Sequence, residues 1–227
     1  LGDADGVGHL AAVFVDHLHI LLGNGGGAVQ NDREAGQTAG TLFVVSGPSG
    51  AGKSTLCRRV VENTGVSLSI SATTRPAGGE EVNGQDYYFL SRTEFEKKIA
   101  DGAFLEYARV FDHYYGTPAE PVLEELKAGR DVILEIDVQG AAQVFAKFPE
   151  AVGIFILPPG EAELRNRLRQ RGRDDQATMA KRLAQAQWEI EQARQNGRYR
   201  YSVVNDDLAA AVREMTEIIE NKQRIRK

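Results

Sequence analysis

The sequence predicts an α/β fold: a P-loop core with a parallel β-sheet flanked by helices, plus a small mostly-β lobe and a helical lid. Four short apolar runs, at 41–46, 131–137, 152–158 and 201–205, have the composition of strands buried on both faces. Helical patterns follow Lys53, cover 118–128, follow Gln139 and begin again at Leu208, with Asp206 or Asp207 as the last N-cap. This alternation of strands and helices is typical of a parallel sheet.

Composition narrows the class of protein. The chain has 227 residues, of which 42% are hydrophobic and 26% charged, and its net charge is −5. The length suggests one domain with small appended lobes, and the charge excludes a global basic footprint for nucleic acid. The single cysteine, Cys57, cannot form an internal disulfide, and no run of 18 apolar residues occurs. We therefore expect a cytoplasmic protein with no membrane segment, no nucleic-acid partner and no obligatory protein partner.

The first forty residues differ from the rest of the chain. They hold 9 of the 24 glycines and 3 of the 4 histidines, and they contain no lysine. The apolar stretch 10–22 lacks the basic flank of a signal peptide and is interrupted by Asp16, His17 and His19. We predict a disordered extension over 1–39, with a short amphipathic helix at 10–22 as the alternative.

Two segments interrupt the α/β pattern of the remaining domain, 40–227. Residues 69–116 are rich in aromatic side chains, and Ser91 with Glu94 forms a capping-box pattern for a helix near 92–100. We interpret this segment as a small, mostly β lobe. Residues 160–195 are helical in pattern and hold five arginines between 165 and 173, which indicates a lid. The core is then 41–68, 117–159 and 196–227.

The segment GPSGAGKS at 47–54 matches the P-loop pattern, with a strand before it and a helix after it. Its glycines let the backbone N–H groups point at phosphate oxygens, and the helix N-terminus adds positive potential. Lys53 is placed to bridge the β- and γ-phosphates of ATP, and Ser54 to ligate Mg²⁺. Thr55 belongs to the helix, where a structural role is favoured. The predicted ATP-binding set is Gly47, Pro48, Ser49, Gly50, Ala51, Gly52, Lys53, Ser54 and Thr55.

An acid at the end of a buried strand is the usual partner of a P-loop. Asp137 ends the apolar run VILEID and is predicted to position the magnesium ion, through a water molecule. Glu135 lies two residues earlier and is expected to point to the opposite face. One of the two carboxylates is then only a solvated strand end.

A kinase that acts on a small molecule needs a second cradle, for the phosphoryl acceptor. The segment SATTR at 71–75 offers hydroxyls and the guanidinium of Arg75, which can bind a phosphate through two hydrogen bonds. Tyr87 and Tyr115 add phenol hydroxyls. Glu106 is an acid inside the apolar stretch FLEYARVF, and buried acids need partners. Guanine offers its N1–H and its N2 amine side by side, which a carboxylate can accept, whereas adenine lacks this pair of donors.

These segments together resemble the guanylate kinase family. The resemblance rests on ISATTRPAGGEEVNGQDYYF, EYARVFDHYYGTP, LEIDVQG and VVNDD, which occur in the family's order and spacing and extend over 41–222. It implies a core domain, a lobe that binds GMP, a mobile lid, and phosphoryl transfer from ATP to GMP with Mg²⁺.

The same resemblance implies roles for individual residues. It implies that guanine is contacted by Ser71, Glu106, Asp137 and Thr117, and that the phosphate of GMP is bound by Arg75, Tyr87 and Tyr115. It also implies that the transferring phosphoryl group is stabilised by Arg167, Arg171 and Arg182, and that Asn205 lies beside adenine.

The lid can also be argued from charge. Arg167 and Arg171 are four residues apart and therefore share one helix face, from which they could close over both phosphates. We expect both to stand far from the P-loop when no nucleotide is bound. One position departs from the family, because Gly78 stands where a second phosphate-binding arginine is usual. That contact with the GMP phosphate is then missing or supplied by another residue, for instance Arg109.

Two other functions compete with this one. Another small-molecule P-loop kinase would share the phosphate loop, but Glu106, Asp137 and the SATTR segment favour guanine. A non-catalytic binding module would be expected to have lost the P-loop or the lid arginines, and here both are intact.

Overall fold

The computed structural model of the chain describes residues 39–110, 112–170 and 176–226. The predicted extension therefore lies almost wholly outside the described residues, and Arg171 lies outside them too. Among the described residues, no helix has both the length and the apolar character needed to cross a membrane.

The core of the described chain is a parallel sheet of five strands in the order β2-β7-β1-β8-β9. Their bounds are β1 Leu42–Ser46, β2 Ser67–Leu68, β7 Val132–Glu135, β8 Val152–Leu157 and β9 Tyr199–Val204. β1 lies in the centre, where Val44 is paired with Leu134 on one side and with Gly153 on the other. All five residues of β1 are buried, as expected for a strand covered on both faces.

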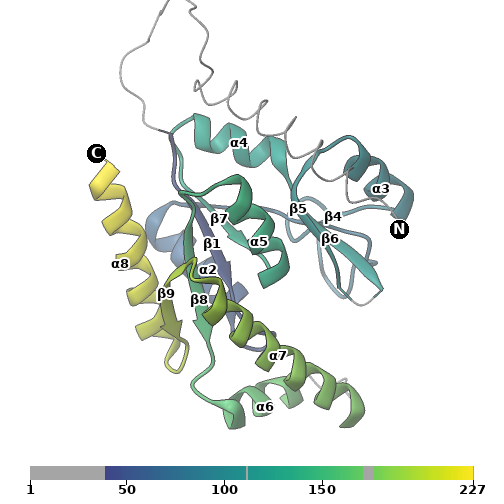
Figure 1. The fold of residues 1–227 in the computed structure, drawn as a ribbon, viewed down its shortest axis with the longest axis vertical. Helices are drawn as coiled ribbons and strands as arrows, with labels where there is room; N and C mark the ends of the chain where they lie inside the picture. Colours follow the sequence, from purple (N-terminus) through teal and green to yellow (C-terminus); the bar gives the residue numbers. More distant parts are fainter. Residues whose placement is uncertain (1–38, 111, 171–175, 227) are drawn as a thin grey trace, which may run out of the picture.

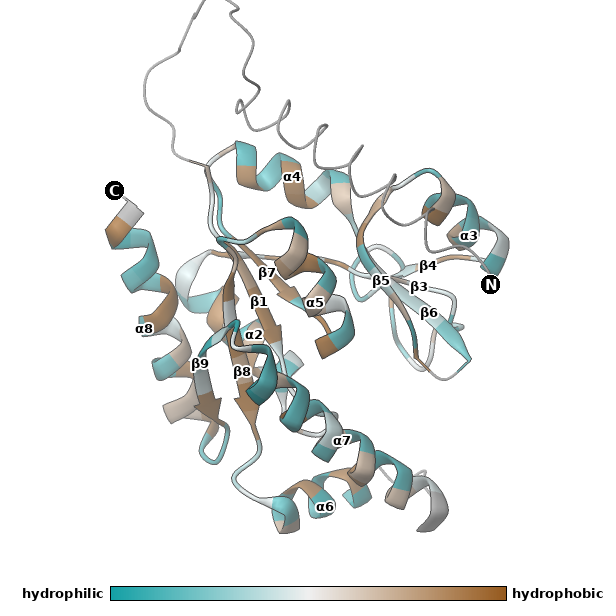
Figure 2. Cartoon of the chain, viewed as in Figure 1, coloured by the Kyte–Doolittle hydropathy of each residue, from teal (hydrophilic) through white to brown (hydrophobic). Residues whose placement is uncertain are grey.

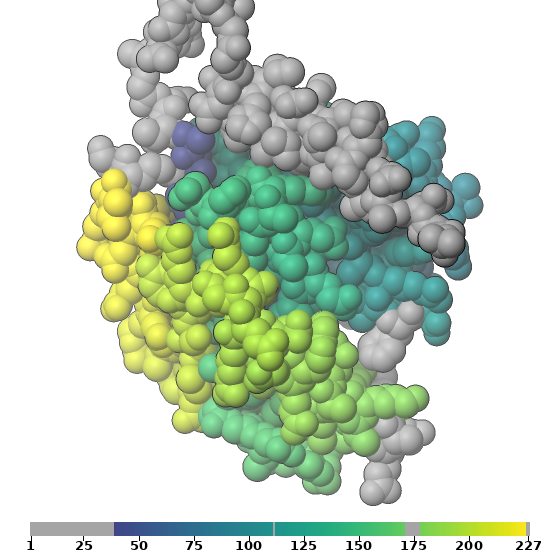
Figure 3. All heavy atoms as spheres, in the orientation of Figure 1, coloured from purple at the N-terminus to yellow at the C-terminus, as the bar shows by residue number. Residues whose placement is uncertain are grey.

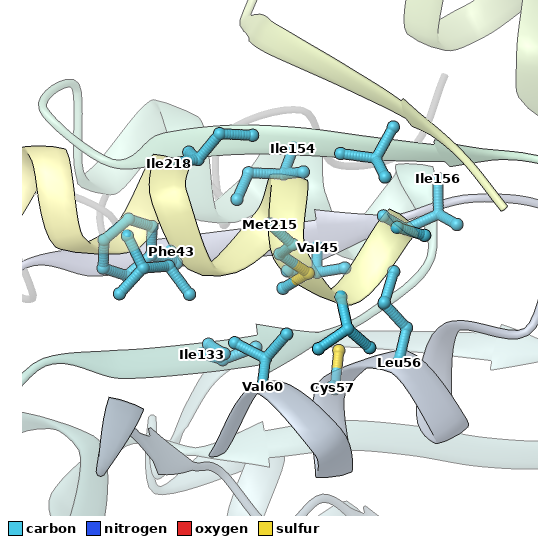
Figure 4. Close-up of a cluster of buried hydrophobic side chains, with 14 of the residues drawn as sticks. Phe43, Val45, Leu56, Cys57, Val60, Ile133, Ile154, Ile156, Met215 and Ile218 are labelled. Carbon is cyan, nitrogen blue, oxygen red and sulfur yellow. The ribbon is translucent and has the colours of Figure 1, made fainter. Parts of the chain in front are cut away.

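Helices cover both faces of this sheet (Figure 1). On one face, α2 (Lys53–Thr64) and α8 (Leu208–Arg226) pack against Phe43, Val45 and Ile154, and Figure 4 shows Met215 and Cys57 inside this cluster. On the other face, α4 (Ala119–Lys127) and α5 (Val138–Lys147) pack against Leu42 and Val44. Alternate residues of β1 thus face opposite layers, and the apolar colouring of Figure 2 is concentrated on the central strands.

A second sheet of four described strands, in the order β4-β3-β6-β5, forms the lobe. Its strands are β3 Ala72–Thr73, β4 Tyr88–Phe89, β5 Phe104–Val110 and β6 His113–Pro118. The helix α3 (Arg92–Ala100) begins at the predicted capping box of Ser91 and Glu94. Phe95 from this helix stacks between Phe104 and Tyr114, with ring centroids 4.5 and 5.4 Å away, so the lobe has its own small core.

The segment predicted as a lid contains two described helices, α6 (Glu161–Gln170) and α7 (Gln176–Asn196). They share a cluster of Leu164, Leu168, Leu183 and Ala186. The C-terminal part of α7 packs on Val138 and Phe155 of the core through Ala193. Figure 3 shows the atoms of the lobe at the right of the view and the atoms of α6 and α7 in its lower and central part.

The α/β fold class predicted from the sequence is confirmed. The predicted strands and helices are present within a few residues, and Asp207 is the N-cap of α8, since its Oδ1 accepts from the amide of Ala210 at 2.7 Å. β2 was not predicted, because two residues of mixed polarity carry no periodic signal. The apolar run 131–137 ends as a strand at Glu135, not at Asp137.

Candidate active site

The P-loop follows β1 and leads directly into α2. Gly50 and Gly52 adopt φ values of 89° and 87°, in the left-handed region that glycine reaches without strain. No described side chain caps the first turn of α2, so its amide groups are left for a ligand. Such a helix start is a ready site for phosphate.

Lys53 lies folded over this loop. Its Nζ donates to the carbonyl oxygen of Gly47 at 2.6 Å and to that of Pro48 at 3.3 Å. The ammonium group therefore stands at the mouth of the loop with neutral partners, which an anionic phosphate can replace at little cost.

The side chain of Asn205 holds the P-loop in place through a hydrogen bond. Its side chain is only 6% exposed, and its Nδ2 donates to the carbonyl oxygen of Ala51 at 2.8 Å. A Cβ atom at Gly52 would collide with this Nδ2. The resemblance implied a place beside adenine for Asn205, whereas the structure uses its amide to hold the P-loop.

The helix α6 also contacts the P-loop. Arg167 Nη2 donates to the carbonyl oxygen of Asn205 at 3.0 Å, and Arg167 Nε donates to Glu163 at 2.8 Å. A Cβ atom at Gly50 would lie 3.0 Å from Leu164 and 3.2 Å from Leu168. Arg167 thus contacts Asn205, a residue that itself holds the P-loop, and the apolar face of α6 packs on that loop. That its position depends on nucleotide stays a prediction.

Two carboxylates lie at the end of β7, Glu135 as its last residue and Asp137 two residues beyond it. Ser54 Oγ donates to Glu135 Oε1 at 2.6 Å, while Asp137 Oδ1 accepts from the amides of Gln139 and Gly140, both at 2.8 Å, and so caps α5. Both acids line the same pocket, so the expectation of opposite faces is wrong. Residues two positions apart in an extended chain share a face. Glu135, rather than Asp137, is the direct partner of Ser54.

This group of oxygen atoms fits a magnesium ion. A hydroxyl and two carboxylates border the phosphate loop, and Mg²⁺ is usually held by one or two carboxylates together with water and substrate phosphates. The side chains that would hold the ion are Ser54, with Glu135 or Asp137 directly or through water.

Glu106 lies buried on the acceptor side of the pocket. It is 5% exposed, and its Oε1 accepts from the Thr117 hydroxyl at 2.7 Å. Burial raises the pKa of Glu106 to about 7, although the hydrogen bond from Thr117 acts in the opposite direction. A Cβ atom at Gly140 would collide with the Glu106 carboxylate, so only glycine fits there. A carboxyl group poised near neutral pH in a polar pocket is typical of a functional site.

Aromatic hydroxyls complete the acceptor side. The rings of Tyr87 and Tyr115 meet edge to face with centroids 6.2 Å apart, and Ser71 lines the same wall. The Arg75 guanidinium lies 5.5 Å from the centre of the Tyr87 ring.

These groups enclose one continuous pocket of about 560 Å³. The P-loop and the end of β7 form one wall, the lobe forms a second, and α7 contributes Arg182. Of the residues predicted from the sequence, the pocket is lined by Gly47, Ser49, Gly50, Gly52, Lys53, Ser54, Thr55, Ser71, Tyr87, Glu106, Tyr115, Asp137 and Arg182.

Comparison with known proteins agrees with this geometry. The sequence model of the guanylate kinase family, described as "Guanylate kinase", matches residues 39–222. The chain belongs to the guanylate kinase family.

Individual relatives support the same assignment. The guanylate kinase of Caldanaerobacter subterraneus subsp. tengcongensis is 50% identical over 181 residues, which are 79% of this chain and 86% of that protein. The guanylate kinase of Neisseria meningitidis serogroup A is 51% identical over 181 residues, with 79% and 87% covered. The crystal structure of guanylate kinase from Anaplasma phagocytophilum has a TM-score of 0.69 and 32% identity, covering 82% of this chain and 88% of that one.

Several predicted residues do not line the pocket. Pro48 and Ala51 belong to the P-loop but do not line the pocket. Arg75 contacts the ring of Tyr87, and Thr117 is hydrogen-bonded to Glu106. Asn205 holds the P-loop through the carbonyl of Ala51, and Arg167 donates to the backbone of Asn205.

The prediction missed some lining residues. Arg109 was named only as a substitute clamp, and Glu135 only as the alternative acid. Gln185 and Glu189 lie on the same face of α7 as Arg182, at spacings of three and seven residues, and this helical periodicity could have indicated them.

Proposed function

We propose that this chain catalyses reversible phosphoryl transfer from ATP to GMP, giving ADP and GDP, with the described pocket as its active site. The observation that carries the proposal is a pocket with a P-loop on one wall and a buried carboxylate, Glu106, on another. The first group suits a nucleoside triphosphate, and the second suits a base that offers two adjacent N–H donors.

On the acceptor side, Glu106 would accept hydrogen bonds from N1–H and N2 of guanine, with Ser71 and Asp137 beside it. Thr117 donates to Glu106 Oε1, and this bond fixes the carboxylate and leaves Oε2 for the base. Only the ionised carboxylate can accept from both guanine groups. Tyr87, Tyr115 and Arg75 would hold the phosphate of GMP.

On the donor side, the amides of the P-loop and of α2 would bind the phosphates of ATP. Lys53 would exchange the loop carbonyls for the β- and γ-phosphate oxygens. Ser54 and an acid of the β7 end would hold Mg²⁺, which as a Lewis acid neutralises charge on the same oxygens. Stabilising charge that develops in the transition state raises the rate of transfer.

The helical segment 160–195 would supply positive charge to the transferring phosphoryl group. Arg182 of α7 lines the pocket together with Lys53. A cation on either side of the transferring group, in a site that excludes water, favours transfer to GMP over hydrolysis.

Steady-state assays test the proposal. ADP release is measured with GMP, AMP, UMP, CMP and dTMP as acceptors, and we expect efficient turnover with GMP alone. Lys53→Ala should lower kcat about 100-fold or more, because the lysine acts on charge in the transition state. Lys97→Ala removes an equal charge from the exposed face of α3 and serves as the control. Turnover without preference for GMP, or normal turnover in Lys53→Ala, would refute the proposal.

A further inference from the structure

A two-point ion pair joins Arg75 to Glu81, a residue to which the proposed function gives no role. Arg75 Nη2 donates to Glu81 Oε1 at 2.8 Å, and Arg75 Nη1 donates to Glu81 Oε2 at 2.9 Å. The two side chains are each 28% exposed. A pair of this geometry fixes the plane of the guanidinium as well as its position.

The donors of Arg75 are divided between two edges of the guanidinium. The second proton of Nη1 goes to the carbonyl oxygen of Pro76 at 2.8 Å, so Glu81 and Pro76 together take three of the five N–H groups. The other two, on Nε and Nη2, share one edge of the fork, and the guanidinium also has a side-chain hydrogen bond with Tyr115, which lines the pocket. Two parallel donors on one edge are what a phosphate group binds.

The carboxylate of Glu81 is itself anchored. Its Oε2 also accepts from the backbone amide of Gly78 at 2.7 Å. The bond from Arg75 and then the bond from Gly78 lower the pKa of Glu81, so it is ionised at neutral pH. A carboxylate held by the backbone of its own turn is a fixed support for the arginine, and an incoming phosphate does not need to displace it.

Aromatic rings restrict the guanidinium from the side. Its central carbon lies 5.5 Å from the ring centre of Tyr87 and 5.8 Å from that of Phe89. Tyr87 lines the pocket, so the supported arginine lies next to a wall of the acceptor site.

We propose that Glu81 is a positioning residue of the acceptor-phosphate site: it holds Arg75 by one edge and thereby presents the other edge to the phosphate of GMP. This inference rests on the proposed function of Arg75. An unsupported arginine side chain would have to lose its rotamer freedom when the phosphate binds, and a pre-ordered one loses little. Glu81 therefore increases affinity for GMP although it carries the same sign of charge as the phosphate.

The test compares Glu81→Gln with Glu80→Gln. Glu80 is the neighbouring, exposed glutamate of the same turn, so its substitution removes the same charge without breaking the pair. We expect Glu81→Gln to raise KM for GMP about tenfold, the effect of losing roughly one supporting hydrogen bond to a charged group. KM for ATP, kcat and Tm should stay close to those of Glu80→Gln.

Two further readouts separate positioning from a general structural role. Guanosine lacks the phosphate, so its binding, measured by calorimetry, should be equal in Glu81→Gln and the parent chain. In an Arg75→Ala background, Glu81→Gln should raise KM for GMP no further, because residues that act through one another are not additive.

The possible failures can be told apart. An unchanged KM for GMP in Glu81→Gln would overturn the inference, and so would a lowered KM, which would mean that the carboxylate competes with the phosphate. If Glu81→Gln is too unstable to assay, the same comparison is made with Glu81→Ala. An unchanged KM for GMP in Arg75→Ala would instead overturn the proposed role of Arg75, and this inference with it.

Discussion

Glu106→Gln should both disable the acceptor site and stabilise the fold above neutral pH. Burial raises the pKa of Glu106 from 4.5 to about 7. At about 1.4 kcal/mol for each pH unit, this difference means that ionising the buried carboxyl group costs the folded state about 3.5 kcal/mol. Glutamine keeps the shape and an oxygen for the Thr117 hydroxyl, and it cannot ionise.

The sign of the pH dependence follows from proton binding. Between pH 4.5 and pH 7 the folded state holds a proton on Glu106 that the unfolded state has released. The contribution of Glu106 to stability is therefore fully present below pH 4.5 and is lost as pH rises through 7. Integrated between pH 5 and pH 8, this contribution falls by about 2.5 kcal/mol in the parent chain and is absent in Glu106→Gln.

The assay is denaturant unfolding of both proteins at pH 5, 6, 7 and 8. The amide of the variant also has an N–H₂ group without a hydrogen-bond partner, which costs about 1 kcal/mol at every pH. This cost cancels when the difference in stability between the two proteins at pH 5 is subtracted from the difference at pH 8. A stability difference between the two proteins that is flat across this range would refute the reasoning. In kinetics, the same variant should raise KM for GMP by orders of magnitude with KM for ATP little changed, because an unpaired donor would face guanine.

Three other predictions use the same assays. KM for GMP should fall as pH rises through about 7, because guanine binding needs the ionised form of Glu106; a constant KM from pH 6 to 8 would contradict this. Gly78→Arg should lower KM for GMP about tenfold or more, because it adds a cation next to the phosphate-binding Arg75. The backbone can accept the side chain, since Gly78 lies outside the left-handed region and a Cβ atom there would be 3.5 Å from Arg75 Nη1. An unchanged KM would mean that another cation already supplies this contact. Asn205→Ala should raise KM for ATP and for GTP as donors by similar factors, because Asn205 holds the carbonyl of Ala51; a rise for ATP alone would instead mean that it reads adenine.

Local patterns explain what the sequence could predict. The glycines of the loop and the helix from Lys53 follow each other directly, and their conformation depends mainly on neighbouring residues. The capping box of Ser91 and Glu94 is equally local. The strand of 42–46 pairs with distant strands, but its continuous apolar run already indicates burial on both faces.

Contacts between distant segments explain what the sequence could not predict. Ser54 meets Glu135 across 81 positions, and Asn205 meets Ala51 across 154. Which of the two acids at the end of β7 faces Ser54 depends on where the strand ends, and the apolar run gave no sign that it ends at Glu135. The Arg75–Glu81 pair spans only six positions, but its role depends on where the lobe places Arg75 relative to Tyr87, which lines the pocket.

The turn between β7 and α5 connects the two halves of the active site. Glu135 ends the strand beside Ser54 on the donor side, and two residues later Asp137 caps α5 through the amide of Gly140. The same Gly140 lies against the Glu106 carboxylate, where a Cβ atom would come within 2.9 Å of its Cδ. Because the partner of the Ser54 hydroxyl and the neighbour of the Glu106 carboxylate belong to one short segment, this turn joins the proposed magnesium site to the proposed guanine site. We therefore expect a substitution that displaces this turn, such as Gly140→Ala, to raise KM for GMP and to lower kcat together.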